Sequence, residues 1–445
     1  MMQQGIHSKR CWIDGRLQEA TIFFNDGIIT SIGIGVNYTL ENTTDVGNNI
    51  LMPGIIDAHV HINEPGRTDW EGFDTATKAA AAGGITSIVD MPLNASPVTT
   101  TLDAFNLKLG STNGKMHVHA GFYGGLIPGN INDIEALLDA GVLGIKAFLT
   151  HSGIDEFPNV GAEELNAIMP LLARRQVPLL VHCELSDDIH GDELSLYPAN
   201  YKSYLSSRPK EWENKAVQMM IDLCRKHQCP THIVHVSSAD CIPIIKAAKA
   251  EGLPLTAETC PQYIYFNAEE IPDSNTLFKC APPIREKENN DLLKQALKQK
   301  VLDFITTDHS PAPPSIKEIE TGNLLKAWGG IAGLQFLLPA SWTVLKNVLT
   351  LTEFIPLITE KPAEFLKLSD RKGFLKEGFD ADFVVWSDEE SFYVKEENIF
   401  HKHKASPYVG RQLFGVIHST YVNGKLVYDG QQIINKNQGQ WLLKK

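Results

Sequence analysis

Two histidines one residue apart end the first long apolar run of the chain. The run Gly54-Ile55-Ile56-Asp57-Ala58 is followed by His59, Val60 and His61. In a β-strand, side chains at positions i and i+2 point to the same face, so His59 and His61 would direct both imidazoles to one point. Two neutral imidazoles at one point suit a divalent metal ion. The spacing alone is a weak signal, because two unrelated histidines at a strand end would look the same.

Four more polar residues stand in apolar segments that read as strands. In a barrel of parallel strands, groups at the carboxyl ends of the strands meet at one rim. We therefore expect these four side chains to lie with His59 and His61 in one site. They are Lys146 in Gly144–Leu149, His182 at the end of Leu179–His182, His235 in His232–Val236, and Asp308 at the end of Phe304–Asp308.

Lys146 is the unusual member, because an unpaired ammonium inside an apolar strand is costly and repels a metal ion. Reaction with carbon dioxide would convert it into a carbamate, an anion with two oxygens that can bridge two cations. We therefore predict a centre of two divalent ions, with the Lys146 carbamate and a hydroxide between them. One metal is assigned to His59, His61 and Asp308, and the other to His182 and His235. In the alternative interpretation, Lys146 extends its amine toward solvent and each histidine is a hydrogen-bonded core residue.

Other histidines test the specificity of this argument. His117 and His119 have the same spacing, but they follow the turn Asn113-Gly114 and fall early in their strand, so we interpret them as structural. His232, at the start of the His235 strand, is interpreted in the same way. The stretch His401-Lys402-His403-Lys404 is expected to be a solvated run of charges.

Apolar segments that resemble strands alternate with helical stretches through the middle of the chain, and this alternation is typical of βα units and a parallel sheet. Eight strands indicate a closed (β/α)8, TIM-like barrel. They are expected at Ile55–His61, Ile85–Asp90, Met116–Gly121, Gly144–Leu149, Leu179–His182, His232–Val236, Leu255–Glu258 and Phe304–Asp308. Helices are expected at Asp74–Ala82, Lys210–His227 and Lys287–Lys300.

Both ends of the chain have a different sequence pattern, in which short apolar runs are separated by dipeptides typical of β-hairpin turns, such as Asp14-Gly15 and Asn423-Gly424. A length of 445 residues fits one barrel of about 250 residues plus a smaller module. We predict that residues 1–53 and 371–445 form one small β-sandwich, and that residues 54–370 form the barrel.

Composition narrows the kind of partner. A net charge of −13 and a pI near 5.6 argue against nucleic acid and anionic membranes, which require clustered Lys and Arg. The N-terminal residues lack an apolar signal region, and no stretch is long enough to span a bilayer. Seven scattered cysteines without a Cys-x-x-Cys pair fit reduced thiols. The sequence therefore indicates a cytoplasmic protein that acts on a small molecule.

Taken together, the motifs resemble those of the cyclic amidohydrolases, the family of dihydroorotases, hydantoinases and allantoinases, over nearly the whole chain. The matching motifs are Asp57-Ala58-His59-Val60-His61, Glu64-Pro65-Gly66-Arg67, Ala82-Gly83-Gly84-Ile85-Thr86, Val181-His182-Cys183-Glu184, His235-Val236-Ser237-Ser238 and Thr307-Asp308-His309-Ser310-Pro311. The resemblance implies a metal-dependent barrel beside a β-sandwich, and a carboxylated lysine at the position of Lys146. It also implies a homotetramer, and zinc is the expected metal.

Departures from the dihydroorotase pattern bear on the substrate. Dihydroorotases carry an arginine for the substrate carboxylate immediately before the Glu-Pro-Gly motif, where this chain has Asn63. Loss of a bidentate cation favours an uncharged ring. The segments Met91-Pro92-Leu93-Asn94, residues 326–335 and residues 406–411 are similar to those of allantoinases. The resemblance thus implies hydrolysis of allantoin to allantoate, with Asp308 moving the proton and Asn63 and Asn94 as weaker candidates for substrate contacts. Dihydroorotase or broad hydantoinase activity, and a non-catalytic assembly protein of the same fold, are the alternatives.

Overall fold

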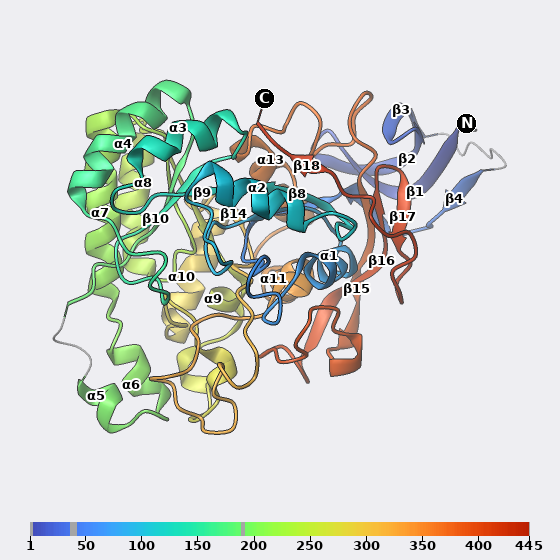
Figure 1. The fold of residues 1–445 in the computed structure, drawn as a ribbon. Helices are drawn as coiled ribbons and strands as arrows, with labels where there is room; N and C mark the ends of the chain where they lie inside the picture. Colours follow the sequence, from blue (N-terminus) through green and yellow to red (C-terminus); the bar gives the residue numbers. More distant parts are fainter. Residues whose placement is uncertain (1–2, 36–41, 188–191, 445) are drawn as a thin grey trace.

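The computed structural model describes residues 3–35, 42–187 and 192–444. A barrel of parallel strands occupies the middle of the chain, and a sheet built from both termini lies beside it (Figure 1). The barrel strands are β6 (Ile55–Val60), β7 (Ile85–Asp90), β8 (His119–Phe122), β10 (Ile145–Phe148), β11 (Leu179–His182), β12 (Thr231–Ile233), β13 (Leu255–Thr259) and β14 (Phe304–Ile305). The predicted fold class, an α/β barrel with a β-sandwich from both ends, is confirmed.

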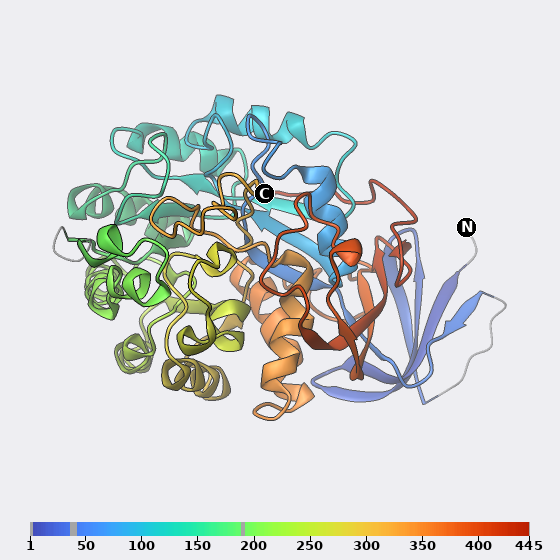
Figure 2. The ribbon, with the colours of Figure 1, turned by 90° about the horizontal axis from the view of Figure 1, so that it is seen from below.

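Helices follow every barrel strand and surround the barrel when it is seen from below (Figure 2). The first α-helices after the eight barrel strands are, in chain order, α1 (Phe73–Ala82), α2 (Leu102–Ser111), α3 (Ile131–Asp139), α4 (Ala162–Arg175), α5 (Asp192–Leu196), α8 (Ile242–Ala250), α9 (Pro261–Tyr265) and α11 (Leu337–Leu345). Further helices are α6 (Tyr201–Ser206), α7 (Lys210–His227), α10 (Lys287–Lys298), α12 (Leu351–Phe354) and α13 (Glu360–Phe365).

Hydrogen bonds between backbone groups close the barrel where its two sheets meet. Strands β9 (Gly124–Gly125) to β14 form one sheet, and β6 to β8, together with β18 (Trp441–Leu442), form another. The amide of Leu143 donates to the carbonyl of Phe122 at 2.8 Å, which joins β8 to β10. On the other side, the amide of His61 donates to the carbonyl of His309 at 2.8 Å. The last contact joins the end of β6 to the residues that follow β14.

Local sequence explains the elements that carry the site. All six residues of β6 are buried, as expected for a parallel strand covered on both faces. In α7, Glu211 and Glu213 lie in the first turn and Arg225, Lys226 and His227 in the last, which complements the helix dipole. The helix ends at Gln228, whose φ of 49° is left-handed. The expected range of this helix, 210–227, is confirmed.

Five of the eight predicted strands are shorter in the structure than expected, and two of them end before residues of the site. Strand β12 ends at Ile233, before His235, which has a φ of 41°, and β14 ends at Ile305, before Asp308, which has a φ of 47°. Left-handed backbone breaks a strand ladder and costs about 1–3 kcal/mol for a residue other than glycine. His235 and Asp308 therefore lie in the loops that follow the strands and not in the strands themselves.

Eight strands from the two termini form one sheet with its own apolar core, which includes Ile6, Ile22, Leu51 and Phe383. The order is β17-β16-β15-β5-β1-β2-β3, with β4 paired to β1. The strands are β1 (Gln4–Ile13), β2 (Arg16–Asn25), β3 (Ile28–Ile34), β4 (Thr43–Asp45), β5 (Ile50–Pro53), β15 (Phe383–Tyr393), β16 (Gln412–Val422) and β17 (Lys425–Tyr428). Strand β5 joins the two halves, because it pairs with both β1 and β15.

The last described residues leave this sheet and return to the barrel. Strand β18 (Trp441–Leu442) pairs in parallel with β8. Here His117 and His119 have the structural role predicted for them: the Nδ1 of His117 accepts from the amide of Asn437, and the Nδ1 of His119 accepts from the amide of Gln440. We keep the domain boundaries at residues 53 and 370 as a proposal, with β18 as an arm of the C-terminal part that lies on the barrel.

The interpretation of residues 401–404 as a solvated run is wrong for His401. Its side chain is fully buried, 5.7 Å from the ring of His309 between centroids, although Lys402 and Lys404 are exposed. The amide of Lys402 donates to the buried carboxylate of Glu71, which holds the segment against the residues between β6 and α1. The charged stretch thus contains one buried residue, which packs against His309.

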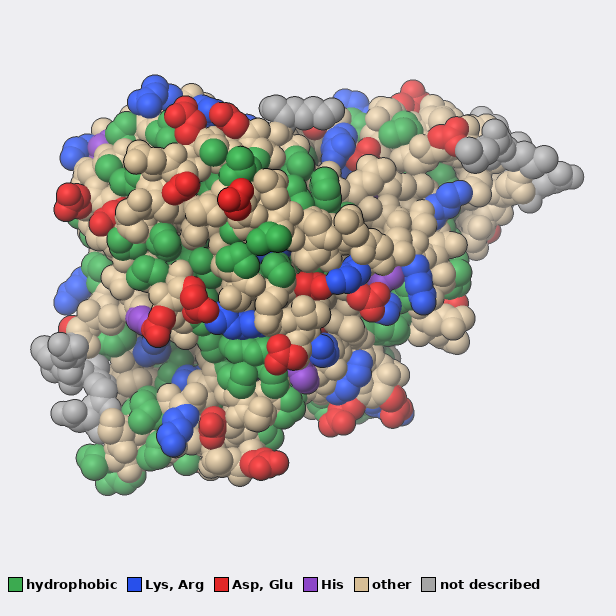
Figure 3. All heavy atoms as spheres, in the orientation of Figure 1, with side chains coloured by type: hydrophobic (Ala, Val, Ile, Leu, Met, Phe, Trp, Pro, Cys, Tyr) green, Lys and Arg blue, Asp and Glu red, His purple; other side chains and the backbone are tan. Residues whose placement is uncertain are grey.

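The described helices include none long and apolar enough to cross a membrane. On the face seen in Figure 3, acidic and basic side chains are interspersed over the described surface. All seven cysteines are buried and free, in agreement with the expectation of reduced thiols.

Asp382 connects the terminal sheet to the barrel. Its carboxylate accepts from Lys372 Nζ at 2.6 Å and from the amide of Asn423 at 2.9 Å, and it lies 3.3 Å from His119 Nε2. Burial opposes ionisation of Asp382, but Lys372 and His119 outweigh it and hold its pKa below the usual range. The carboxylate is therefore ionised and bound on three sides.

We expect Asp382→Asn to lower the free energy of unfolding by about 3 kcal/mol, the low end for a broken buried ion pair, because Lys372 keeps Asp380 as a partner. The measurement is the urea midpoint at pH 7. The native contribution declines below about pH 4, where the unfolded carboxylate becomes protonated. The exposed Asp291→Asn is the control and should change the value by less than about 0.5 kcal/mol. Equal effects of the two variants would contradict the role of Asp382.

Candidate metal centre

His59, His61 and Asp308 meet at the rim of the barrel. Nε2 of His59 and Nε2 of His61 each lie 3.2 Å from Asp308 Oδ1. One possible ligand atom from each of the three residues lies within 4.8 Å of the others, and all three side chains are buried. Imidazole and carboxylate groups at this spacing suit a divalent metal ion.

Asp57 holds the two chain segments of this cluster together. Its carboxylate accepts from the amide of His59 at 3.2 Å and from the amide of Thr307 at 3.2 Å, and the Thr307 hydroxyl donates to its second oxygen. Burial raises the pKa of Asp57 to about 7 despite these hydrogen bonds. Asp57 therefore fixes the residues beside His59 and Asp308 without reaching the cavity.

His182 and His235 form a second pair. Nδ1 of His182 lies 3.0 Å from Nε2 of His235, and the ring of His182 stacks on Phe148 with 4.5 Å between centroids. The ring of His235 is also 5.5 Å from that of His59. Two ring nitrogens facing one another at this distance can share a proton or donate their lone pairs to one cation. The second pair is thus adjacent to the first cluster.

Lys146 is fully buried in β10, and its Nζ has no hydrogen-bond partner within the described residues. The nearest aromatic contact places Nζ 5.0 Å from the ring centre of Phe148. Burial lowers the pKa of Lys146 to about 8, although Asp308 and Glu258 oppose the shift. A buried amine without a partner and with a lowered pKa has the properties that carbamate formation requires, since the neutral amine is the reactive form.

The pKa shifts of His61 and His235 also favour metal binding. Burial lowers the pKa of His61 to about 4 and holds that of His235 well below its usual value, so both rings are neutral and have a free lone pair. For His59, burial favours the neutral ring, but Asp308 and Glu258 outweigh it and raise its pKa. Buried ring nitrogens of His59, His61 and His235 lack hydrogen-bond partners within the described residues. The residues present therefore fit a cationic group in the space between them.

Two buried glutamates orient the histidines, and neither role was predicted from the sequence. Glu258, in β13, accepts from His59 Nδ1 at 2.6 Å and lies 3.1 Å from His232 Nε2. Glu184 lies 2.8 Å from His182 Nε2. A carboxylate on the far nitrogen fixes the tautomer and orientation of a metal-binding imidazole. The position of Glu258 could have been recognised from the sequence, because Glu258 ends a predicted strand at the same rim of the barrel as the other candidate residues.

We expect Glu258→Gln to weaken metal binding by about 10- to 100-fold, because a neutral amide supports the His59 ring less well than a carboxylate. The measurement is a titration of metal-free protein with Zn²⁺. Asp303→Asn is the matched control: Asp303 also supports β13, through the amide of Ala257 and through Lys249, but among the described residues it makes no hydrogen bond to His59 or His232. An unchanged affinity in Glu258→Gln, or an equal loss in the control, would reject the orienting role.

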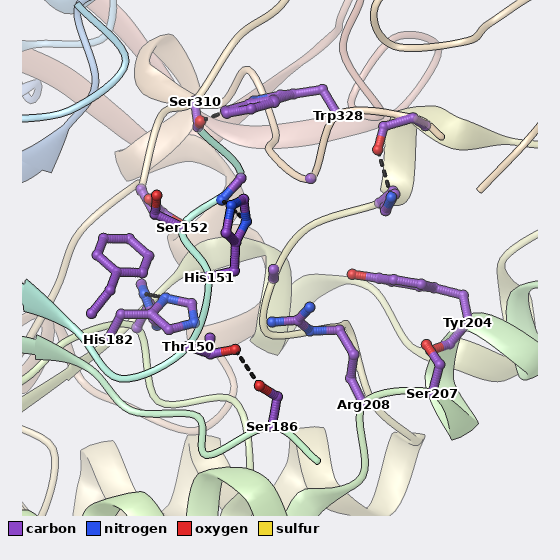
Figure 4. A pocket seen from close by; sticks show the side chains of 18 of the residues that line it. Thr150, His151, Ser152, His182, Ser186, Tyr204, Ser207, Arg208, Ser310 and Trp328 are labelled. Carbon is purple, nitrogen blue, oxygen red and sulfur yellow. Dashed lines mark hydrogen bonds between the residues drawn. The ribbon is translucent and has the colours of Figure 1, made fainter. Parts of the chain in front are cut away.

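One cavity of about 730 Å³ contains the whole set. Its lining includes His59, His61, Asn94, Lys146, His182, His235 and Asp308. Figure 4 shows His182, Arg208, Tyr204 and Trp328 approaching this cavity from different sides. His151 also lines it and is largely exposed. Asn63 does not belong to the lining: it is fully buried, and its amide donates to the carbonyl of Pro311 at 3.4 Å.

A (β/α)8 barrel with a histidine and carboxylate cluster at the carboxyl ends of its strands defines the class of metal-dependent barrel hydrolases. The chain belongs to the amidohydrolase family, whose model matches residues 50–427. This matched region extends from β5 to β17 and includes every predicted metal ligand.

Relatives and solved structures agree with the family assignment. The chain is 42% identical over 443 residues to a probable allantoinase of Oryza sativa, with 95% of this chain and 87% of the relative covered. It is 41% identical to the allantoinase of Arabidopsis thaliana over the same shares of the two chains. The L-hydantoinase structure from Arthrobacter aurescens is 30% identical and superimposes with a TM-score of 0.94, covering 100% of both chains.

Proposed function

We propose that this protein is an allantoinase, which opens the hydantoin ring of allantoin by hydrolysing its cyclic amide to give allantoate. The observation that carries the proposal is the His59, His61 and Asp308 cluster, set beside Lys146 and a second histidine pair in one cavity. Similarity to the Oryza sativa and Arabidopsis thaliana proteins over 95% of the chain selects allantoin among the cyclic amides.

The proposed centre contains two divalent ions. His59, His61 and Asp308 would hold one ion and His182 and His235 the other, with the Lys146 carbamate as a ligand of both. We propose zinc because imidazole and carboxylate ligands suit it. When bound, the ions supply Lewis acidity and make hydroxide available near pH 7.

Asp308 is the proposed acid and base. Burial opposes its ionisation, but His59 and His61 outweigh it and hold the pKa of Asp308 well below its usual range, so the side chain is ionised. Its side chain reaches the cavity, where it can take a proton from the attacking water and return it to the departing ring nitrogen. One carboxylate can serve both steps because the proton that it gains is the one that the leaving group needs.

For substrate contacts we retain Asn94, which lines the cavity, and we withdraw Asn63, whose amide is used inside the protein. We further propose a cytoplasmic homotetramer. A relative from Aquarana catesbeiana, which is 40% identical to this chain, is named a mitochondrial allantoinase. The non-catalytic alternative is disfavoured because all six proposed ligand positions carry the residue types that the metal centre requires, and all six residues line one cavity.

A three-substrate assay tests the activity. We expect zinc-loaded protein to hydrolyse allantoin with kcat/KM at least about tenfold above that for hydantoin, since one recognised polar group is worth about that factor. Dihydroorotate, which carries a carboxylate, should be the poorest of the three. Hydantoin turnover is the main competitor, because the Arthrobacter aurescens structure is an L-hydantoinase. Preferential turnover of dihydroorotate or hydantoin would replace the proposed substrate.

Lys146→Ala tests the bridging ligand. We expect the variant to lose bound metal and at least about 100-fold in kcat, because orienting residues outside the ligand set already account for 10- to 100-fold. Acetate or propionate should restore part of the activity by occupying the vacated space. Lys146→Arg, which keeps a cation but forms no carbamate, should be inactive without rescue. Full metal occupancy and normal kcat in Lys146→Ala would refute the bridging role.

A further inference from the structure

Arg208 brings a guanidinium to the cavity wall next to the proposed metal centre. It is the one arginine among the described residues that line the cavity. It lies between α6 and α7, and its backbone carbonyl accepts from Arg285 Nη1 at 3.1 Å. Figure 4 shows its side chain reaching inward beside Tyr204 and Ser207. The backbone of Arg208 is therefore anchored by Arg285.

Glu184 fixes the direction of this guanidinium. Arg208 Nε donates to Glu184 Oε1 at 3.1 Å, and Nη2 donates to Oε2. Among the described residues, none accepts a hydrogen bond from Nη1. Because the carboxylate engages one edge of the planar group, the remaining N–H groups have a defined direction and stay available to a ligand.

The position of Arg208 matches the chemistry of the proposed substrate. The ureido arm of allantoin is attached to the ring carbon next to the carbonyl that is attacked. A group that recognises this arm must therefore lie beside the ligand cluster and not at the cavity mouth. Only one carboxylate separates Arg208 from His182, whose Nε2 lies 2.8 Å from Glu184. A urea carbonyl is a strong neutral acceptor, and a charged donor is its strongest partner.

We propose that Arg208 is a specificity-determining residue that donates from Nη1 to the carbonyl oxygen of the ureido arm. This inference rests on the proposed function and extends it. Glu184 then has two roles, since it orients His182 and aims Arg208. The selection of a ring with a ureido arm over an unsubstituted ring thus comes from the same carboxylate that organises the second histidine pair.

The test compares Arg208→Lys with the wild type on allantoin and on hydantoin, which has the ring without the arm. Lysine keeps the charge beside Glu184 but lacks the second edge of the guanidinium. We expect kcat/KM for allantoin to fall by about 10- to 100-fold, as for the loss of a charged hydrogen bond. The value for hydantoin should change by less than about threefold. If hydantoin is not hydrolysed, its inhibition constant against allantoin replaces its kcat/KM.

Lys326→Met is the matched control, because it removes an exposed cation from the rim of the same cavity without contacting Glu184. Its allantoin to hydantoin ratio should equal that of the wild type, and zinc content should be normal in both variants. An equal fall for both substrates in Arg208→Lys would overturn the inference and assign Arg208 a structural role. A wild type that does not hydrolyse allantoin would instead refute the proposed function.

Discussion

The hydrogen bonds that close the barrel are also the ones that assemble the first ligand cluster. The amide of His61 binds the carbonyl of His309, and the carboxylate of Asp57 binds the backbones of both His59 and Thr307. These contacts join the first barrel strand to the residues after the last one. If the barrel were open at this seam, His59 and His61 would lie on one edge and Asp308 on the other. The cluster is therefore a consequence of closure, and its geometry is only as rigid as this seam.

Carboxylates behind the imidazoles extend this rigidity outward. Glu258 orients His59 and also contacts His232, so the histidine that is structural and the histidine that faces the cavity share one anion. Glu184 does the same for His182 and Arg208. Burying an isolated carboxylate is costly, and each of these is compensated by two partners, of which at least one lines the cavity. The chemistry of the cavity and the stability of the barrel thus depend on the same buried charges.

The sequence was sufficient for the features that follow periodic patterns. The alternation of strands and helices predicted the barrel, and the rim rule selected His59, His61 and Asp308 while it rejected His117 and His119. It did not predict that His235 and Asp308 follow their strands in left-handed backbone, because that conformation is uncommon even for His and Asp, which adopt it more often than most other residues. The burial of His401 and the internal hydrogen bond of Asn63 depend on segments distant in the chain, and they could not be read from neighbouring residues.

Strand β5 pairs with β1 on one side and with β15 on the other, although more than three hundred residues separate β5 from β15 in the sequence. In terms of chain order, the barrel is an insertion within a β-domain, and the two halves of that domain meet only when the barrel brings its own ends together. Contacts of such long sequence separation form late in folding, because the loop that they close is long. Pairing of β5 with β15 therefore depends on a completed barrel. A chain whose barrel is misfolded leaves β5 without β15 and exposes an unpaired strand edge.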